Sequence, residues 1–335
     1  MSDAPRAAVV YNPTKVDVDQ LRSSVAKVAD ASGWQEPTWF ATTQEDAGQL
    51  LTQNAVADGI DMVCAAGGDG TVRAVVEGLR GTEVPMGVIP AGTGNLLARN
   101  LDLPIASIDE AAAIAFGGVS RKIDVGLARI TREDGSVDEN AFVVMAGMGI
   151  DAAMIANTNE TLKKTVGWLA YVDAGVRSLP KARPFRVRYR LEDRPEHSAH
   201  LSTILFGNCG TLTGGIELMP EALVDDGLLD ITVLQPKGLL GWLQVWRKVR
   251  WENSVLRRSS IGRSIIRLTD TGGSATVTYL RASSAAVRLD ELRDIELDGD
   301  EFGTTRAAEF IVLPRALTVQ VRPSDAGTER MRSAG

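Results

Sequence analysis

Two glycine-rich runs contain the residues best suited to chemistry in this chain. They are Gly67-Gly68-Asp69-Gly70-Thr71 and Gly92-Thr93-Gly94-Asn95. Because glycine has no Cβ, backbone N–H groups can come close to a phosphate chain. An aspartate in such a loop would repel phosphate unless a divalent cation lies between them, so Asp69 predicts a divalent cation. Either run alone could be an ordinary turn, but the two together indicate a nucleoside triphosphate and phosphoryl transfer.

Both runs follow predicted strands of an α/β domain. Strand-like and helix-like segments alternate from residue 7 to about residue 117, which predicts a doubly wound, mostly parallel sheet with helices on both faces. Ligands bind beyond the carboxyl ends of such strands, so the two runs and Asn12-Pro13 should meet in one crevice. The expected strands are Ala7–Tyr11, Thr38–Ala41, Ile60–Ala65 and Met86–Ile89. The expected helices are Val18–Ala31, Gln44–Ala57, Val72–Leu79, Asn95–Leu101 and Ile108–Phe116.

The pattern changes near residue 125, where short strand-like runs begin to dominate. Such runs predict a β-rich, antiparallel sandwich as a second domain. We therefore expect a nucleotide-binding domain at 1–124, an acceptor domain at 125–325 and a disordered tail at 326–335. The expected strands are Val125–Ile130, Phe142–Ala146, Phe185–Leu191, Leu201–Gly207, Leu228–Leu234, Ser264–Leu268, Thr276–Leu280, Ala286–Leu289, Asp294–Leu297 and Glu309–Leu313. Two helices are expected among them, near Thr161–Leu179 and Leu239–Arg258.

Composition narrows the function classes. The chain has 335 residues, enough for about two domains, and 44% of them are hydrophobic. A net charge of −7 gives no reason to expect nucleic acid. With two cysteines and two histidines, acid–base chemistry falls to carboxylates. The first residues do not form a signal peptide and no run is long enough to span a membrane, so we expect a cytoplasmic protein.

The order of motifs resembles the diacylglycerol kinase catalytic-domain family, which includes bacterial lipid kinases and is related to sphingosine kinases, NAD kinases and phosphofructokinases. The first loop is similar in all of these groups. The segment Pro90-Ala91-Gly92-Thr93-Gly94-Asn95-Leu96-Leu97-Ala98-Arg99 resembles the second glycine loop of the lipid kinases. Agreeing segments are Tyr11-Asn12-Pro13, Gly147-Met148-Gly149-Ile150-Asp151-Ala152, Gly207-Asn208, Pro220-Glu221-Ala222-Leu223-Val224-Asp225-Asp226-Gly227 and Asp298-Gly299-Asp300.

The chain departs from the family pattern at three places. Arg73-Ala74 stand where the family often has Asn-Glu. The opening loop continues with Thr14-Lys15, which adds a positive charge near the phosphates. The late D-G-E motif reads D-G-D, so the acid at Asp300 is shorter.

The resemblance implies an ATP-dependent lipid kinase with a phosphofructokinase-like or NAD-kinase-like nucleotide domain. Its substrate would be a hydroxyl of diacylglycerol or a related lipid, and its reaction would occur between the two domains. Backbone amides of both loops would hold the triphosphate, helped by the side chains of Asn12, Thr43, Thr71 and Thr93. Asp69 would organise Mg²⁺, Asp298 would be the general base and Asp300 would support it. The pair Asp225 and Asp226 would bind a structural metal.

Each of these roles has a plainer alternative. Asp69 could cap the helix that follows it, and Thr43 could cap a helix beginning at Gln44. Asp298 could be a type I′ turn residue, because Asp-Gly is a common hairpin signal. Asp225 and Asp226 could be an acidic surface turn.

Two basic segments predict peripheral contact with an anionic membrane. Arginine and lysine crowd at residues 177, 181, 183, 186, 188, 190 and 194, and a tryptophan-rich basic helix is expected over 239–251. Such composition suits an interfacial helix, although the helix could equally pack on the sandwich. The lipid and the oligomeric state stay open, with a homodimer among the possibilities.

Two other functions compete with the lipid kinase. One is a soluble-metabolite kinase such as an NAD kinase, although the later G-T-S-x-A-Y segment of those enzymes is missing. The other is a non-catalytic protein that binds lipid or nucleotide on the same scaffold. The presence of Asp69 and Asp298 argues against this last alternative.

Overall fold

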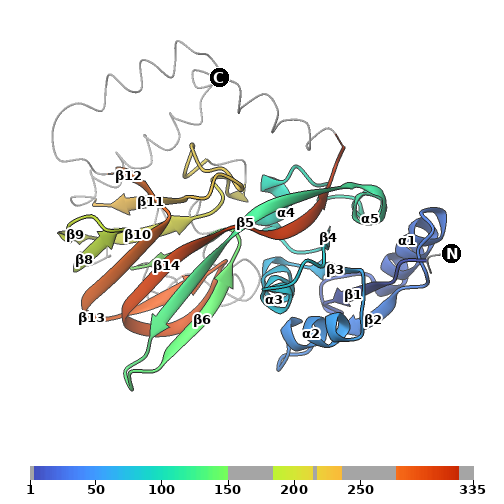
Figure 1. The fold of residues 1–335 in the computed structure, drawn as a ribbon, viewed down its shortest axis with the longest axis horizontal. Helices are drawn as coiled ribbons and strands as arrows, with labels where there is room; N and C mark the ends of the chain where they lie inside the picture. Colours follow the sequence, from blue (N-terminus) through green and yellow to red (C-terminus); the bar gives the residue numbers. More distant parts are fainter. Residues whose placement is uncertain (1–3, 150–183, 214–216, 236–276, 324–335) are drawn as a thin grey trace, which may run out of the picture.

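The structure, a computed structural model, describes residues 4–149, 184–213, 217–235 and 277–323. Its first part alternates strands and helices, as expected (Figure 1). These elements are β1 (Ala7–Tyr11), α1 (Val18–Ala31), β2 (Thr38–Ala41), α2 (Gln49–Ala57), β3 (Met62–Gly67), α3 (Asp69–Leu79), β4 (Met86–Pro90), α4 (Leu96–Asn100) and α5 (Ile108–Gly117).

Parallel pairing in the order β2-β1-β3-β4 builds the sheet of this part. One face is covered by α1 and α5, whose apolar side chains form a buried cluster with alternate strand residues such as Val9 and Cys64. The opposite face packs against α2, α3 and α4. The predicted α/β domain with helices on both faces is therefore confirmed.

Capping side chains decide where the helices begin. The Asp17 carboxylate accepts the Gln20 N–H at 3.0 Å and starts α1 where the sequence predicts it. In contrast, α2 begins at Gln49 rather than at Gln44, because the Asp46 carboxylate accepts the N–H groups of Gly48, Leu50 and Leu51. Residues 44–48, which were expected to be the first part of this helix, are therefore not helical.

The second part consists of antiparallel strands. They are β5 (Val119–Thr131), β6 (Val137–Phe142), β7 (Met145–Met148), β8 (Phe185–Leu191), β9 (His197–Leu201), β10 (Thr203–Gly207), β11 (Leu229–Leu234), β12 (Val277–Ala282), β13 (Ser284–Leu297) and β14 (Asp300–Val321). Phe206 and Phe310 stack inside the sandwich, with ring centroids 3.9 Å apart. The expected β-rich second domain is confirmed, although β6 and β9 were not expected and β13 joins two expected strands into one.

Two long strands join the parts into a single sheet. Both β5 and β14 run from the sandwich to the α/β part (Figure 1), where Val319 of β14 pairs with Met86 of β4. The result is a 14-stranded sheet. The predicted boundary between residues 124 and 125 thus falls inside β5. One buried apolar cluster also continues from α3 and α4 to Met145, Leu205 and Met219 of the second part.

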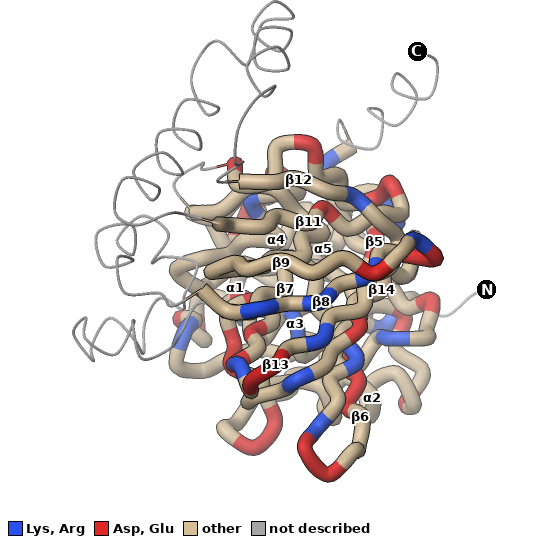
Figure 2. The backbone as a smooth tube through the Cα atoms, turned by 90° about the vertical axis from the view of Figure 1, so that its left-hand side faces the viewer, with Lys and Arg blue, Asp and Glu red and all other residues tan. Residues whose placement is uncertain are grey.

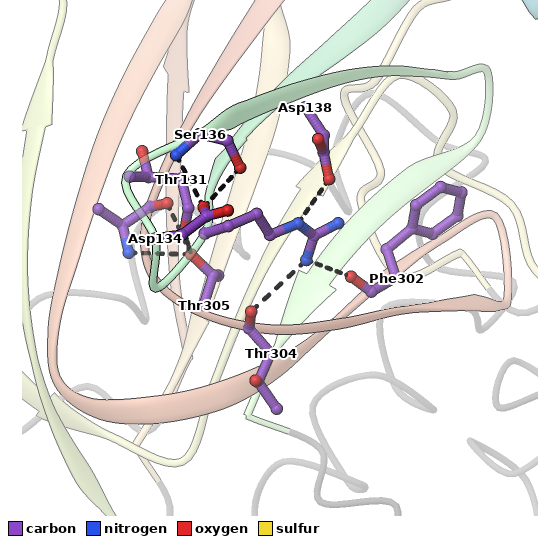
Figure 3. Close-up of polar contacts among 9 residues, drawn as sticks. Thr131, Asp134, Ser136, Asp138, Phe302, Thr304 and Thr305 are labelled. Carbon is purple, nitrogen blue, oxygen red and sulfur yellow. Dashed lines mark hydrogen bonds and ion pairs between the residues drawn. The ribbon is translucent and has the colours of Figure 1, made fainter.

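The tip of the β5–β6 hairpin is fastened to β14 by polar contacts (Figure 3). Asp134 accepts the N–H and hydroxyl of Ser136, which closes the turn between β5 and β6. Arg132 binds the Asp138 carboxylate at 2.5 Å and the Phe302 carbonyl at 2.7 Å. These contacts hold the hairpin against the start of β14.

Several expected elements lie outside the described residues. They are the helices near 161–179 and 239–258, the strand 264–268 and the tail 326–335. Among the helices that the structure does describe, none is both long enough and apolar enough to cross a bilayer.

Candidate active site

The two glycine loops lie against each other at the carboxyl ends of β3 and β4. The Ala91 N–H donates to the Gly67 carbonyl at 2.8 Å, which continues the pairing of the strands. A Cβ on Gly92 would lie 2.6 Å from the Cα of Gly68. Since real Cβ atoms do not come so close to a backbone, the contact requires glycine. The loops predicted to converge do converge.

Asp69 links these two loops. It is the first residue of α3, and its Oδ1 accepts the Leu96 N–H of α4 at 2.6 Å. Burial is the main cause that raises the pKa of Asp69, and the nearby negative charge of Asp300 raises it further. The Asp69 carboxylate therefore caps the N-terminus of α4, the helix after the second glycine loop, and not that of α3. It also lies near Asp300, an acid of the second domain.

The second loop is closed by its own side chains. The Asn95 amide donates to the Gly92 carbonyl and accepts the Gly92 N–H, at 2.7 and 2.8 Å. Arg99 donates to the Gly94 carbonyl at 2.7 Å. Asn95 therefore shapes the loop, while Thr93 is exposed at its tip.

The opening loop folds back on itself. Oδ1 of Asn12 accepts both the N–H and the hydroxyl of Thr14, at 3.0 and 2.8 Å. The Asn12 N–H donates to the Ala66 carbonyl at 3.0 Å, which holds this loop beside the end of β3. Lys15 is exposed next to it.

The three threonines differ in exposure and in contacts. Thr71 is buried in the first turn of α3, and a Cβ on Gly67 would lie 2.6 Å from its hydroxyl. The Thr43 hydroxyl accepts the N–H groups of Glu45 and Asp46, so it stabilises a turn and not the helix at Gln44. Thr71 follows Asp69 by two residues in the first glycine loop, Thr93 lies in the second glycine loop, and Thr43 lies in neither.

Asp298 occupies the turn between β13 and β14. Leu297 pairs with Asp300, and φ is +50° at Asp298 and +93° at Gly299, as in a type I′ turn. Its carboxylate is 4% exposed and accepts three backbone N–H groups, from Val143, Val144 and Met145, at 2.8 to 2.9 Å. Both oxygens are thus engaged by the β6–β7 connection, which differs from the open carboxylate expected of a general base.

The electrostatics of Asp298 follow from this placement. Burial raises its pKa to about 6, against the lowering effect of the three N–H groups and of Arg73. The same β6–β7 connection is held from its other side by Asn208, whose amide donates to the Val143 carbonyl at 3.1 Å. Asp298 and Asn208 therefore both bind the same short backbone segment, residues 143–145.

Asp300 is the acid of this hairpin that faces the glycine loops. A Cβ on Gly70 would lie 3.2 Å from its Oδ2. Its side chain is 46% exposed, and Arg73 of α3 binds it at 2.9 Å. The hairpin of the sandwich and the first glycine loop thus meet at Asp300.

Glu296 is an acid of this site that the sequence did not single out. It lies on β13 opposite Glu301 and is buried, with a 6% exposed surface. Burial and the neighbouring charges of Glu301, Asp294 and Asp300 raise its pKa to about 8. The sequence could have indicated that Glu296 is buried, because it lies between the apolar residues Ile295 and Leu297 just before the Asp-Gly turn.

The pair Asp225 and Asp226 does not fit the expected metal site. Arg121 binds the Asp225 carboxylate through Nε and Nη2 at 3.1 and 2.6 Å. Arg281 binds Asp226, whose other oxygen accepts the Leu228 N–H. The two carboxylates form a turn, as the alternative stated, but both are neutralised by guanidinium groups that leave little room for a cation.

Magnesium fits the Asp69 region better, in the manner of a nucleotide-bound ion. Residues 4–149, 184–213, 217–235 and 277–323 contain no group of three or more His, Cys, Asp or Glu placed to hold a metal. Mg²⁺ is commonly bound by one or two carboxylates together with substrate phosphates. Asp69 is a carboxylate next to the two glycine loops, which suits that arrangement.

Comparison with known proteins agrees with this geometry. Residues 6–128 match the family described as "Diacylglycerol kinase catalytic domain", and residues 143–260 match the "YegS C-terminal NAD kinase beta sandwich-like domain". The chain is 31% identical to a protein named "Probable lipid kinase YegS-like" from Pseudomonas aeruginosa, over 95% of each chain. It is 28% identical to a diacylglycerol kinase of Bacillus subtilis, over 94% of this chain and 95% of that one.

Solved structures show the same fold. A diacylglycerol kinase from Bacillus anthracis has a TM-score of 0.72 at 20% identity, over 97% of this chain and 99% of that chain. A yeast NADH kinase has a TM-score of 0.53 at 9% identity, over all of this chain and 88% of that one. The similarity to the NADH kinase extends to the fold, whereas the sequence similarity is to the lipid kinases.

Proposed function

The chain belongs to the diacylglycerol kinase catalytic-domain family and is a lipid kinase, and from this premise we propose that it transfers the γ-phosphate of ATP to a hydroxyl of diacylglycerol or a related lipid. The observation that carries the proposal is the meeting of Asp300 with Gly70. It brings an acid of the sandwich to the loop that would hold the triphosphate. Transfer needs a positioned phosphate, charge neutralisation and an acceptor for the hydroxyl proton. The contact places a candidate proton acceptor, Asp300, beside the loop that would position the phosphate.

On the nucleotide side, the backbone N–H groups of the two loops would hold the triphosphate. The N-terminus of α3 lies at the first loop and favours negative charge. Asp69 would hold Mg²⁺, which when bound neutralises phosphate charge. Asn12 and Asn95 would act by keeping their loops in shape, because their side-chain oxygens are already engaged.

On the acceptor side, we assign the proton-accepting role to Asp300 and a supporting role to Asp298. Asp300 has an exposed carboxylate beside the loop, whereas Asp298 is buried with both oxygens bound to backbone. A base must reach the hydroxyl to take its proton. The expected order of the two acids is therefore reversed in this proposal.

Contact with an anionic membrane is proposed at the exposed face of β8. Arg186, Arg188 and Arg190 alternate along this strand with buried side chains, and Arg188 is directly opposite Arg288 of β13. Figure 2 shows Lys and Arg residues along β8 and on the neighbouring β13. Arg188 binds Asp290 at 3.5 Å, and the exposed guanidinium groups of this face would attract a negatively charged surface. A lipid kinase with these residues would work at the cytoplasmic surface of a membrane.

An acceptor panel tests the proposed function. Labelled phosphate from [γ-³²P]ATP is followed into vesicles of diacylglycerol, phosphatidylglycerol or a sphingoid base, and into NAD. We expect label in a lipid, with diacylglycerol the best acceptor, and loss of that label on removing Mg²⁺. Label in NADP and in no lipid would overturn the proposal, and label in none of the acceptors would favour a binding protein.

Flotation with vesicles tests the membrane contact separately. The variant Arg186→Gln/Arg188→Gln/Arg190→Gln should float with phosphatidylglycerol vesicles far less than the wild type at low salt. Transfer to a short-chain, water-soluble diacylglycerol should be unchanged. Equal flotation of the two proteins would contradict this contact surface while leaving the reaction in place.

A further inference from the structure

Two departures from the family pattern touch each other in space. Arg73 and Asp300 are 227 residues apart, on α3 and at the start of β14. Nη2 and Nε of Arg73 lie 2.9 and 3.3 Å from Asp300. This is a contact between the nucleotide domain and the sandwich, made by an arginine and an acid that both differ from the usual residues.

The arginine is itself held in place. Its guanidinium lies over the ring of Phe302, 4.6 Å from the centroid. Phe302 and Asp300 are two residues apart on β14, so their side chains lie on the same face of the strand. With a side chain only 14% exposed, Arg73 is packed between helix and strand rather than free in solvent.

Both contacts fall on one oxygen of Asp300. Arg73 uses Nε and Nη2 on Oδ2, and across the described residues no donor contacts Oδ1. One oxygen is thus fixed and the other is left for a substrate hydroxyl. Aspartate is shorter than glutamate by one methylene, about 1.5 Å of reach, so the orientation of its carboxylate matters more.

The charge of Arg73 also falls where acids gather. Asp300 raises the pKa of Asp69, and Glu301, Asp294 and Asp300 together raise that of Glu296. The positive charge of Arg73 lowers the pKa of Asp298. Arg73 therefore adds a positive charge where the hairpin of β13 and β14 carries several acids.

We infer that Arg73 is a positioning residue, which fixes Oδ2 of Asp300 so that Oδ1 faces the acceptor hydroxyl. The inference rests on the proposed role of Asp300 as proton acceptor. Arg73 and Asp300 act as one unit, in which the long arginine side chain on α3 reaches the short carboxylate on β14. Arg73 itself touches no reacting atom in this arrangement.

Three variants test the pairing in the transfer assay with ATP and diacylglycerol vesicles. Arg73→Asn should lower kcat by about 30-fold or more, since misplaced catalytic groups cost up to roughly 100-fold, with the KM for ATP nearly unchanged. Asp300→Glu should also lower kcat, because the longer acid would collide with Arg73. The double variant Arg73→Asn/Asp300→Glu should recover at least about ten-fold over Arg73→Asn, a coupling expected of residues in contact.

Arg73→Lys serves as the conservative variant and Arg80→Asn as the matched control. Lysine keeps the charge but not the two-pronged guanidinium, so kcat should stay below that of the wild type. Arg80 is the C-cap residue of α3 and binds Glu139 of the sandwich at 3.3 Å, away from Asp300, so its variant should keep the wild-type kcat. Since Arg73→Lys preserves both bulk and charge, it tests the inference even where Arg73→Asn does not fold.

The outcomes separate the inference from the proposed function. Effects of Arg73→Asn and Asp300→Glu that simply multiply in the double variant would overturn the pairing. A raised KM for ATP with unchanged kcat would make Arg73 a nucleotide-binding residue and would also overturn it. If Asp300→Asn keeps full activity, the proposed role of Asp300 fails; if only Asp300→Asn is inactive and every Arg73 variant is normal, the inference alone fails.

Discussion

The nucleotide side and the acceptor side of this site keep their shape by different means. On the nucleotide side the two loops touch backbone to backbone at Gly68 and Gly92. On the acceptor side the hairpin carries buried carboxylates, Glu296 and Asp298, whose pKa values are both raised. The first side, where Asp69 is also a buried acid with a raised pKa, should be sensitive mainly to added volume, and the second mainly to charge and pH.

Gly92→Ala should have the largest effect. Its Cβ would lie 2.6 Å from the Cα of Gly68 and 3.0 Å from Oδ1 of Asn95, so the loops must separate. We expect transfer to fall by about 100-fold or more, as when a binding group is misplaced by about 1 Å, and at every pH. Initial rates and ATP titration measure it.

Gly117→Ala is the control for that change. A Cβ there would find only the Ser32 hydroxyl, at 3.8 Å, so activity and stability should stay at the wild-type level. Near-normal transfer by Gly92→Ala would show that the loops are not held by close backbone contact. The nucleotide side would then not be the side that is sensitive to added volume.

Asp298→Asn should destabilise the acceptor side. The amide nitrogen of asparagine donates and cannot accept, so at least one of the N–H groups of Val143, Val144 and Met145 loses its partner. Leaving a buried donor unsatisfied costs about 1–3 kcal/mol. Urea unfolding at neutral pH should show a loss of unfolding free energy in that range, with loss of transfer secondary to it.

Asp134→Asn provides the matched control, because Asp134 caps an exposed turn in the same way through Ser136. It should cost a few tenths of a kcal/mol at most, as exposed turns usually do. A normal stability of Asp298→Asn combined with complete loss of transfer would instead restore the general-base role to Asp298.

Glu296→Gln should change how stability depends on pH. The folded pKa of about 8 exceeds the ordinary value of 4.5, so the folded protein binds a proton more tightly than the unfolded chain. The stability from this group is complete below about pH 4.5 and is lost as the pH rises to 8. The variant should be the more stable protein at pH 8, by on the order of a few kcal/mol, and similar to the wild type at pH 5.

Thermal unfolding between pH 5 and pH 9 measures this difference. Glu291→Gln, which removes an exposed acid of the same strand, should leave the pH profile of the wild type unchanged. A profile of Glu296→Gln parallel to that of the wild type would show that Glu296 is ionised at little cost, and the acceptor side would then not differ from the nucleotide side in charge.

The smallest effect is expected at the β5–β6 hairpin. Arg132→Ala removes the ion pair with Asp138 and the contact to the Phe302 carbonyl (Figure 3). Exposed ion pairs contribute about 1 kcal/mol or less, so we expect a small fall in the free energy of unfolding and unchanged kcat. A large loss of transfer would mean that this hairpin positions the acid at Asp300.

The α/β part of the fold follows closely from the sequence. Strand β1 and helix α1 have the expected bounds, because buried apolar runs and the Asp17 cap act over a few neighbouring residues. Helix α2 begins later than expected because Asp46, a residue placed inside the expected helix, caps it from outside. Strand β9 was missed because the residues of His197–Leu201 are mostly polar and exposed, so no buried apolar run marks it.

The site was predictable on one side only. Glycine marks close backbone contact directly in the sequence, so the two loops could be found. The acceptor side depends on which acid is buried and which is exposed, and that is decided by pairing between segments more than 150 residues apart, such as Asp298 with Val143. For the same reason the sequence marked Arg73 and Asp300 as unusual but gave no sign that they meet.

The central claim is that Asp300, and not Asp298, accepts the proton of the lipid hydroxyl beside the glycine loops. The most direct measurement is the single-turnover rate of phosphate transfer from ATP to diacylglycerol by Asp300→Asn, with ATP affinity measured in parallel. The account predicts a fall of about 100-fold or more, as removal of a general base brings, with ATP affinity and stability kept. A rate within a few-fold of the wild type would contradict it.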